Sequence, residues 1–517
     1  MSDSNARKGI YNVLFGAVSQ VVTIALGIVI PRLFLVSFGS EMNGLLNSVS
    51  QLYIYMGLME AGVGAAALQA LYKPVGQQDR NCINGILSAT NYYYRRIGCW
   101  YLVGVFTLSF LYPLLIKSEI PYWTVVAIIF LNGISGALAF FFQGKYRLLL
   151  QADGRKYVIT NINLIIHIAT SVAKIILIML GCDIIVIQAA YMVLNLLQMV
   201  CISVYVRKNY GWIDLSVSPN QESIAQRNSA FIHQLSDLIF RNTDVLILTF
   251  VPSCGLLAVS VYTMYNMLLS MISTAINTLS SGIEFIMGQA FNIDKKRYIK
   301  YHDIYEVYSM AIIFSLFTIA YLFLQPFLRL YTSGIDDVQY LDKWLPLLFA
   351  ITFLLSAGRR ASANVINYAQ HFKKTQNRAV FESAINISVS LICVFHFKIY
   401  GVLFGTIAAL LYRTNDMILY ANHIILNRSA WPTYRRWLTN LLLFSVFCVS
   451  SKLLYQEVLL NSYIAIILWA ILSCVVIIPI YIVIDSALDR DVFRNVVRVI
   501  RSRKAIQGSD SGVDRNE

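Results

Sequence analysis

The sequence predicts an all-α integral membrane protein with about fourteen transmembrane helices, arranged as two pseudo-symmetric six-helix lobes followed by two C-terminal helices. Three observations lead to this fold class: a low content of charge, apolar segments long enough to span a bilayer, and a loop pattern that repeats along the chain. Of the 517 residues, 57% are hydrophobic and only 13% are charged. A soluble domain carries roughly a quarter charged residues, so lipid is the expected solvent.

Apolar blocks recur along the whole chain, as in residues 14–35, 123–142 and 464–484. A helix needs ~20 such residues to cross a hydrocarbon core of ~30 Å. Because backbone polar groups must be paired within hydrocarbon, these blocks are expected to be helices. Fourteen spanning segments are expected, over residues 9–36, 43–72, 84–116, 121–147, 157–180, 184–207, 229–251, 256–289, 302–331, 341–368, 377–397, 401–426, 436–457 and 461–486.

The loops between these segments differ in their basic residues. With the N-terminus inside, the inner loops and tail hold 28 Lys and Arg, and the outer loops hold five, which are Lys117, Arg329, Lys343, Lys398 and Lys452. Basic residues are enriched in cytoplasmic loops. We therefore expect a multi-pass protein of the cytoplasmic membrane with both termini in the cytoplasm. The net charge of +14 reflects this topology and does not indicate nucleic-acid binding.

The loop positions repeat once. Six loops centre near positions 39, 77, 118, 151, 182 and 210, and six more follow 216 to 221 residues later. Such parallel repeats are a transporter architecture in which the substrate site lies between the two lobes. The expected domains are an N-lobe over residues 1–210, a C-lobe over 228–428, helices 13 and 14 over 429–487, and a basic amphipathic and disordered cytoplasmic tail over 488–517.

Three stretches carry a family resemblance. They are PRLFLVSFGSEMNGLLNSVSQLYIYMGLMEAGVGAAALQALYKP (31–74), with its FGxExNGL turn and Glu-bearing second helix, QADGRKYV (151–158) and FRNTDVLILT (240–249). Together they resemble polysaccharide-type flippases of the multidrug/oligosaccharidyl-lipid/polysaccharide exporter superfamily. The resemblance implies a transporter, not an enzyme. Its implied cargo is an undecaprenyl-pyrophosphate-linked oligosaccharide. Its implied partners are membrane lipids and the glycosyltransferases and polysaccharide polymerase of the same pathway.

Eight basic residues fall inside expected spans, where a charge costs on the order of 3 kcal/mol. Arg95 and Arg96 follow three tyrosines and are interpreted as interface anchors. The other six are candidates to bind a pyrophosphate in a wet cleft: Arg32, Lys174, Arg241, Arg359, Arg360 and Arg413. Arginine suits this role because its planar fork stays charged and binds phosphate through two hydrogen bonds. The alternative is that each basic residue pairs with an acid and fixes helix packing.

Four acidic residues inside expected spans are candidates for ion coupling: Glu60, Asp237, Asp244 and Asp416. Glu60 lies in a stretch of small residues on the second expected helix, where another helix can approach closely. It is expected either to pair with an arginine of a neighbouring helix or to take up a coupling proton or sodium ion. No cofactor and no catalytic residue is expected. The six histidines lack ligand spacing, so no metal site is expected.

Several functions remain open from the sequence. The leading one is a flippase that works by alternating access and ion coupling. A lipid II flippase would use the same mechanism on another headgroup. A multidrug antiporter of the same superfamily would have to bind organic cations, which an arginine-lined cavity repels. A membrane polysaccharide polymerase or acyltransferase generally needs a sizeable outer loop, and the longest one expected, over 331–340, is short.

Overall fold

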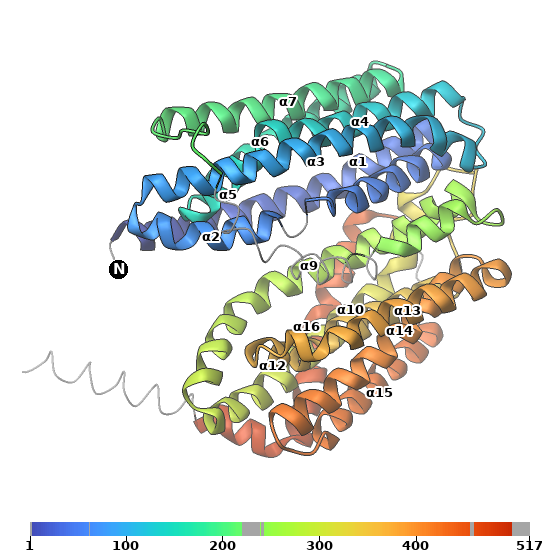
Figure 1. Cartoon of the computed structure of the whole chain (residues 1–517). Coiled ribbons are helices and arrows are strands. Elements are labelled where there is room, and N and C mark those ends of the chain that lie inside the picture. The colour runs from blue at the N-terminus through green and yellow to red at the C-terminus, as the bar shows by residue number, and fades with distance from the viewer. Residues whose placement is uncertain (1–2, 61–62, 220–237, 239–241, 455–459, 499–517) are drawn as a thin grey trace, which may run out of the picture. The chain divides into compact units, whose positions relative to one another are not determined.

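The computed structural model describes residues 3–60, 63–219, 238, 242–454 and 460–498 (Figure 1). Over these residues the regular structure is helical, with no β-strand. Ten of the described helices are long and apolar enough to cross a membrane. The all-α membrane fold class predicted from the sequence is confirmed. The chain forms two compact units, one of residues 1–263 with 334–338, the other of residues 264–333 with 339–517.

The first unit is built mainly from seven helices that pack around an apolar core. Their bounds are α1 (Asp3–Gly57), α2 (Val63–Gln77), α3 (Arg80–Leu115), α4 (Tyr122–Phe142), α5 (Gly144–Ala152), α6 (Lys156–Met179) and α7 (Ile184–Asn209). The beginning of α9 (Gly255–Ile293) also belongs to this unit. Helix α1 packs on α6, and α4 packs on both α3 and α7. Leu45, Ile128 and Ile187 are fully buried where these helices meet.

The second unit contains the rest of α9 and the helices that follow. Their bounds are α10 (Lys295–Tyr331), α11 (Leu345–Gly358), α12 (Arg360–Tyr368), α13 (Phe372–Phe397), α14 (Ile399–Leu419), the π-helix η2 (Tyr420–Ile425), α15 (Trp431–Leu454) and α16 (Tyr463–Leu488). Helices α13 and α14 form the closest pair. Gly405 allows this approach, because a Cβ there would lie 2.1 Å from Ser390 Oγ.

The order of helices repeats with an offset of 216 residues. That offset carries α5 onto α12 at both ends, and it carries the first residues of α6 onto those of α13. It also relates two glycines with positive φ, Gly39 (φ 79°) and Gly255 (φ 74°). The repeat inferred from loop positions is thus present in the helix boundaries.

The FGSEMNGL motif forms the kink of α1. Gly39 has φ 79° and ψ 173°, a conformation open mainly to glycine. The next residue, Ser40, donates from its backbone N and its Oγ to the Asp337 carboxylate, each at 2.6 Å. A Cβ on Gly44 would lie 1.9 Å from the backbone oxygen of Leu256. The motif therefore packs α1 directly against the start of α9.

The QADGRKYV motif closes the turn between α5 and α6. Gly154 takes a positive φ of 72°. Asp153 contacts Arg155 Nε at 2.9 Å and accepts a hydrogen bond of 2.5 Å from Tyr210 Oη. Burial, followed by the adjacent Asp153, raises the pKa of Tyr210, so its hydroxyl remains a donor at neutral pH. This turn thereby fixes the end of α7.

Three segments expected as unbroken helices are interrupted, which corrects the prediction. Segment 43–72 breaks after Gly57, segment 121–147 breaks at Gln143, and segment 341–368 breaks at Arg359. Two of these breaks adjoin a glycine that faces an aromatic ring. A Cβ on Gly144 would lie 2.3 Å from the Tyr94 ring, and one on Gly358 would lie 2.5 Å from the Trp437 ring. Ring packing accounts for the glycines, and a glycine weakens a helix interior.

The two C-terminal helices pack on α10 within the second unit. Arg436 of α15 forms ion pairs with Asp303 at 2.9 Å and Asp489 at 2.8 Å, and with the fully buried Glu306. Tyr481 of α16 shares a 2.9 Å hydrogen bond with Thr318. After α16, residues 490–498 are helical, and the rest of the expected tail lies outside the described residues.

Candidate functional site

Glu60 lies in the break between α1 and α2, not in the middle of a helix as predicted. Its backbone N donates to the oxygen of Gly57 at 3.0 Å, a spacing of three residues typical of a tight 3₁₀ turn. Its half-buried carboxylate accepts a 2.5 Å hydrogen bond from Tyr94 Oη of α3. Gly64 permits this contact, since a Cβ there would lie 3.1 Å from the same hydroxyl.

Arg147 of α5 is a basic residue within electrostatic reach of Glu60. Its Nη2 donates to Asn163 Oδ1 of α6 at 3.0 Å. The same oxygen accepts a 2.5 Å hydrogen bond from Gln198 Nε2 of α7. Arg147, the last residue of the expected span 121–147, lies half-buried on α5. The pairing of Glu60 with an arginine of a neighbouring helix stays a prediction.

Two small polar cavities lie beside this network in the first unit. Their volumes are about 290 and 260 Å³. Both are lined by Tyr191, Asn195 and Gln198 of α7. The described residues that line them include amides and hydroxyls but no Asp, Glu, Lys or Arg. Such lining groups can hold water or hydroxyl-rich molecules by hydrogen bonding.

Lys174 of α6 lies between aromatic rings of two other helices. Its Nζ is 4.5 Å from the ring centroid of Tyr191 on α7 and 5.7 Å from that of Phe34 on α1. The cation is thus stabilised by π-faces next to the polar cavities. Arg32 is half-buried on α1, one residue after the helix-internal Pro31.

In the second unit, three arginines share two carboxylates. Arg359 Nη1 lies 2.5 Å from Glu382 Oε1, and Arg413 Nε lies 3.4 Å from Glu382 Oε2. Arg413 Nη1 also lies 2.6 Å from Asp416, which Arg378 contacts as well. The cluster joins the α11–α12 break to α13 and α14. Acid pairing, the structural alternative, is thus present for Arg359 and Arg413.

The remaining candidates are spread over other surroundings. Arg360 begins α12 as a half-buried residue, near enough to Tyr305 to act on it electrostatically. Asp244 is 5% exposed and accepts a 2.8 Å hydrogen bond from Tyr262 Oη of α9. Arg241 and Asp237 lie outside the described residues.

Sequence reasoning missed several members of these networks. Glu382 lies within the expected span 377–397, and Arg378 lies at its end. The rule that charges inside the membrane mark sites could therefore have found Glu382. Asn163, Gln198 and Tyr94 gave no such signal, because uncharged polar residues are common in transmembrane helices and only the fold brings these three to Arg147 and Glu60.

Comparison with known proteins finds solved structures of similar fold, but no match by sequence. No protein-family model and no curated protein sequence matches the chain. Among solved structures, "Lipid II flippase MurJ, inward closed conformation" aligns with TM-score 0.67 and 12% identity, over 93% of this chain and 100% of the other. An inward-facing multidrug resistance MATE family transporter of the MOP superfamily aligns with TM-score 0.64 and 14% identity, over 78% and 94%.

For a third solved structure, the reverse polarity of the binding pocket is said to suggest a different function. This MOP superfamily transporter from Pyrococcus furiosus aligns with TM-score 0.53 and 15% identity, over 82% of this chain and 96% of the other. At these identities the similarity establishes the fold alone. The chain has the helical membrane fold of MOP superfamily transporters, among which multidrug transporters and a lipid II flippase are represented.

Proposed function

We propose that the chain is a flippase that moves an undecaprenyl-pyrophosphate-linked oligosaccharide across the cytoplasmic membrane by alternating access. The observation that supports it is the arginine cluster of the second unit, where Arg359, Arg378 and Arg413 gather around Glu382 and Asp416. Basic residues on transmembrane helices are costly and therefore mark substrate sites. Arginine also binds the oxygens of a pyrophosphate through paired hydrogen bonds.

Arg359 is the member of the cluster best placed to act on a ligand. It lies at the break between α11 and α12, and transporter folds place substrate groups at such discontinuous helices. Its side chain is 13% exposed, whereas that of Arg413 is 6% exposed. In this proposal Arg359 binds the pyrophosphate, while Arg413 holds Glu382 and Asp416 in place. Arg32, Lys174, Arg360 and Arg241 are further candidates.

Ion coupling forms the second part of the proposal. Glu60, with Tyr94 and Arg147 as partners, is the proposed residue that exchanges a proton or sodium ion during the cycle. Asp244 and Asp416, and Asp237 outside the described residues, are further candidates. No organic cofactor is required by this mechanism. The proposed protein partners are glycosyltransferases and a polymerase of the same polysaccharide pathway.

A double variant separates substrate binding from ion pairing at Arg359. Arg359→Ala alone should abolish glycan display at normal membrane expression. If Arg359 served only to neutralise Glu382, the double variant Arg359→Ala/Glu382→Ala should recover display. We expect it to stay inactive, and we expect Arg359→Lys to recover in part, because lysine keeps the charge but not the planar fork. Arg494→Ala, at a 70% exposed side chain of the C-terminal helix, is the control that should export normally.

A lipid II flippase is the second candidate, favoured by the alignment that covers 100% of such a flippase. Both cargoes carry a pyrophosphate, so the arginine cluster suits either. Complementation distinguishes them. Rescue of cells depleted of their lipid II flippase would favour the second candidate, and rescue of cells lacking a polysaccharide-unit flippase would favour the first.

A further inference from the structure

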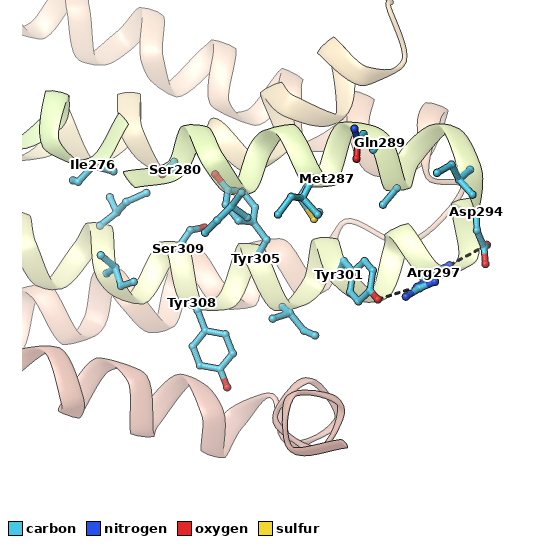
Figure 2. Close-up of a pocket in the computed structure, with 17 residues that line it drawn as sticks. Ile276, Ser280, Met287, Gln289, Asp294, Arg297, Tyr301, Tyr305, Tyr308 and Ser309 are labelled. Atoms are coloured by element: carbon cyan, nitrogen blue, oxygen red, sulfur yellow. Dashed lines mark hydrogen bonds between the residues drawn. The ribbon is translucent and has the colours of Figure 1, made fainter. Parts of the chain in front are cut away.

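The second unit contains a large apolar groove between α9 and α10 (Figure 2). Its volume is about 690 Å³, more than twice that of either polar cavity in the first unit. The walls are mostly aliphatic, and several wall residues are strongly exposed, with Ile283 at 50%, Ile286 at 62% and Ile293 at 85%. The groove thus presents apolar surface that the described part of the second unit leaves uncovered.

The groove is a feature of this helix pair and does not follow from the repeat. Helices α2 and α3 stand 216 residues before the second half of α9 and α10, and they pack directly through buried Leu71, Ile83 and Leu87. In contrast, α9 and α10 are joined directly at Asp294 and still enclose a cavity. The space between them is therefore available to an apolar molecule.

The mouth of the groove is basic. It lies at the start of α10, where the sequence reads KKRYIK over residues 295–300. All four cations there are exposed, and Arg297 is the one of them among the described residues that line the groove. Asp294 lies beside them, but its carboxylate caps α10 by accepting from the backbone N of Lys296 and Arg297 at 2.9 and 3.1 Å. Arg297 Nε donates to Tyr301 Oη at 2.8 Å, so the tyrosine holds the guanidinium at the mouth (Figure 2).

An apolar groove with a cationic mouth fits one kind of molecule, an amphiphile with an apolar chain and an anionic head. The basic-residue asymmetry of the loops assigns this mouth to the cytoplasmic side. The cytoplasmic leaflet is rich in anionic lipid, and each nearby Lys or Arg adds to the attraction. We propose that this groove binds an anionic glycerophospholipid of the cytoplasmic leaflet, with an acyl chain between α9 and α10 and its phosphate on Arg297.

Photolabelling tests the site without requiring transport. The purified protein is placed in phosphatidylcholine nanodiscs that contain a trace of phosphatidylglycerol with a diazirine on one acyl chain. Adducts should map to residues 276–293 and 304–312 by mass spectrometry. The same probe with a phosphatidylcholine head should label this groove roughly tenfold less, because its quaternary ammonium cancels the net charge of the phosphate and is repelled by the cations of residues 295–300.

Two variants and two controls define the result. Ile286→Trp fills the groove and should lower labelling by phosphatidylglycerol, while Leu468→Trp, at a 61% exposed position on α16, should not. Arg297→Glu should reduce labelling to the level of the phosphatidylcholine probe, while Lys208→Glu at the inner end of α7 should leave it unchanged. Equal labelling by both probes, or adducts spread over all exposed helices, would overturn the proposal. So would displacement of the probe by undecaprenyl pyrophosphate at equal concentration, since the groove would then belong to the cargo.

Discussion

In the first unit, glycines leave the space that the side chains of neighbouring residues need. Tyr94 is fully buried and reaches Glu60 because Gly64 and Gly144 leave room for its hydroxyl and its ring. The sequence placed Glu60 in a small-residue region but could not indicate Tyr94 as the donor to its carboxylate. Tyr94 lies 34 positions away along the chain, and only the packing of α3 brings it close.

Glu60→Gln tests the role of this carboxylate. The substitution keeps the volume and the acceptor for Tyr94 but removes the negative charge of the carboxylate. We expect normal expression, loss of most transport, and a flatter dependence of the remaining transport on pH or sodium. Transport is measured by glycan display across a range of pH and sodium concentration. Wild-type transport in this variant would leave Glu60 as a packing residue.

Gly44→Ala tests the close approach of α1 and α9. The added Cβ would meet the backbone oxygen of Leu256, which cannot move as a flexible side chain can. Overpacking of this kind costs about 1–3 kcal/mol, so the melting temperature in detergent should fall measurably. Gly16→Ala is the control, because nothing lies within 4 Å of its Cβ position. Equal melting temperatures for the two variants would contradict the contact.

At the scale of elements, the helix order was predictable and the helix breaks were not. Long apolar blocks and evenly spaced loops indicate spans and a repeat, and the 216-residue offset between α5 and α12 shows that the repeat extends to short helices. The breaks at Gln143 and Arg359 lack a proline. Each break adjoins a glycine, Gly144 or Gly358, against which an aromatic ring of another helix packs, and sequence periodicity does not report such packing.

Arg436→Ala tests how α15 is attached to α10. The variant leaves Glu306 buried without its ion-pair partner, although Thr433 still donates to it at 3.0 Å. Breaking a buried pair by removing one partner costs about 3–5 kcal/mol. We expect a protease to cleave the chain between α15 and the rest of the unit faster in this variant than in the wild-type protein. Arg435→Ala removes a pair whose arginine is 44% exposed and should have little effect. Equal cleavage rates would contradict the structural role of Arg436.

For the whole molecule, the membrane topology is predicted from the basic residues. The inner loops and tail hold 28 of them, and the outer loops hold five. Gly154 lies in the turn between α5 and α6, which this topology places in the cytoplasm. Gly154→Cys should react with a membrane-impermeant maleimide only after the cells are permeabilised, provided that the native cysteines are first replaced. Ready labelling in intact cells would reverse the assigned orientation.

The proposed function is the movement of a lipid-linked oligosaccharide between leaflets. Its most direct test is a reconstitution in liposomes with undecaprenyl-pyrophosphate-linked oligosaccharide that carries a fluorescent sugar label. An impermeant quencher added outside removes the outer-leaflet signal at once, and the inner-leaflet signal only as lipid is flipped. We predict that wild-type protein exposes the inner-leaflet pool and that Arg359→Ala/Glu382→Ala does not. An inner-leaflet pool that stays protected with wild-type protein, as it does in protein-free liposomes, would contradict the claim.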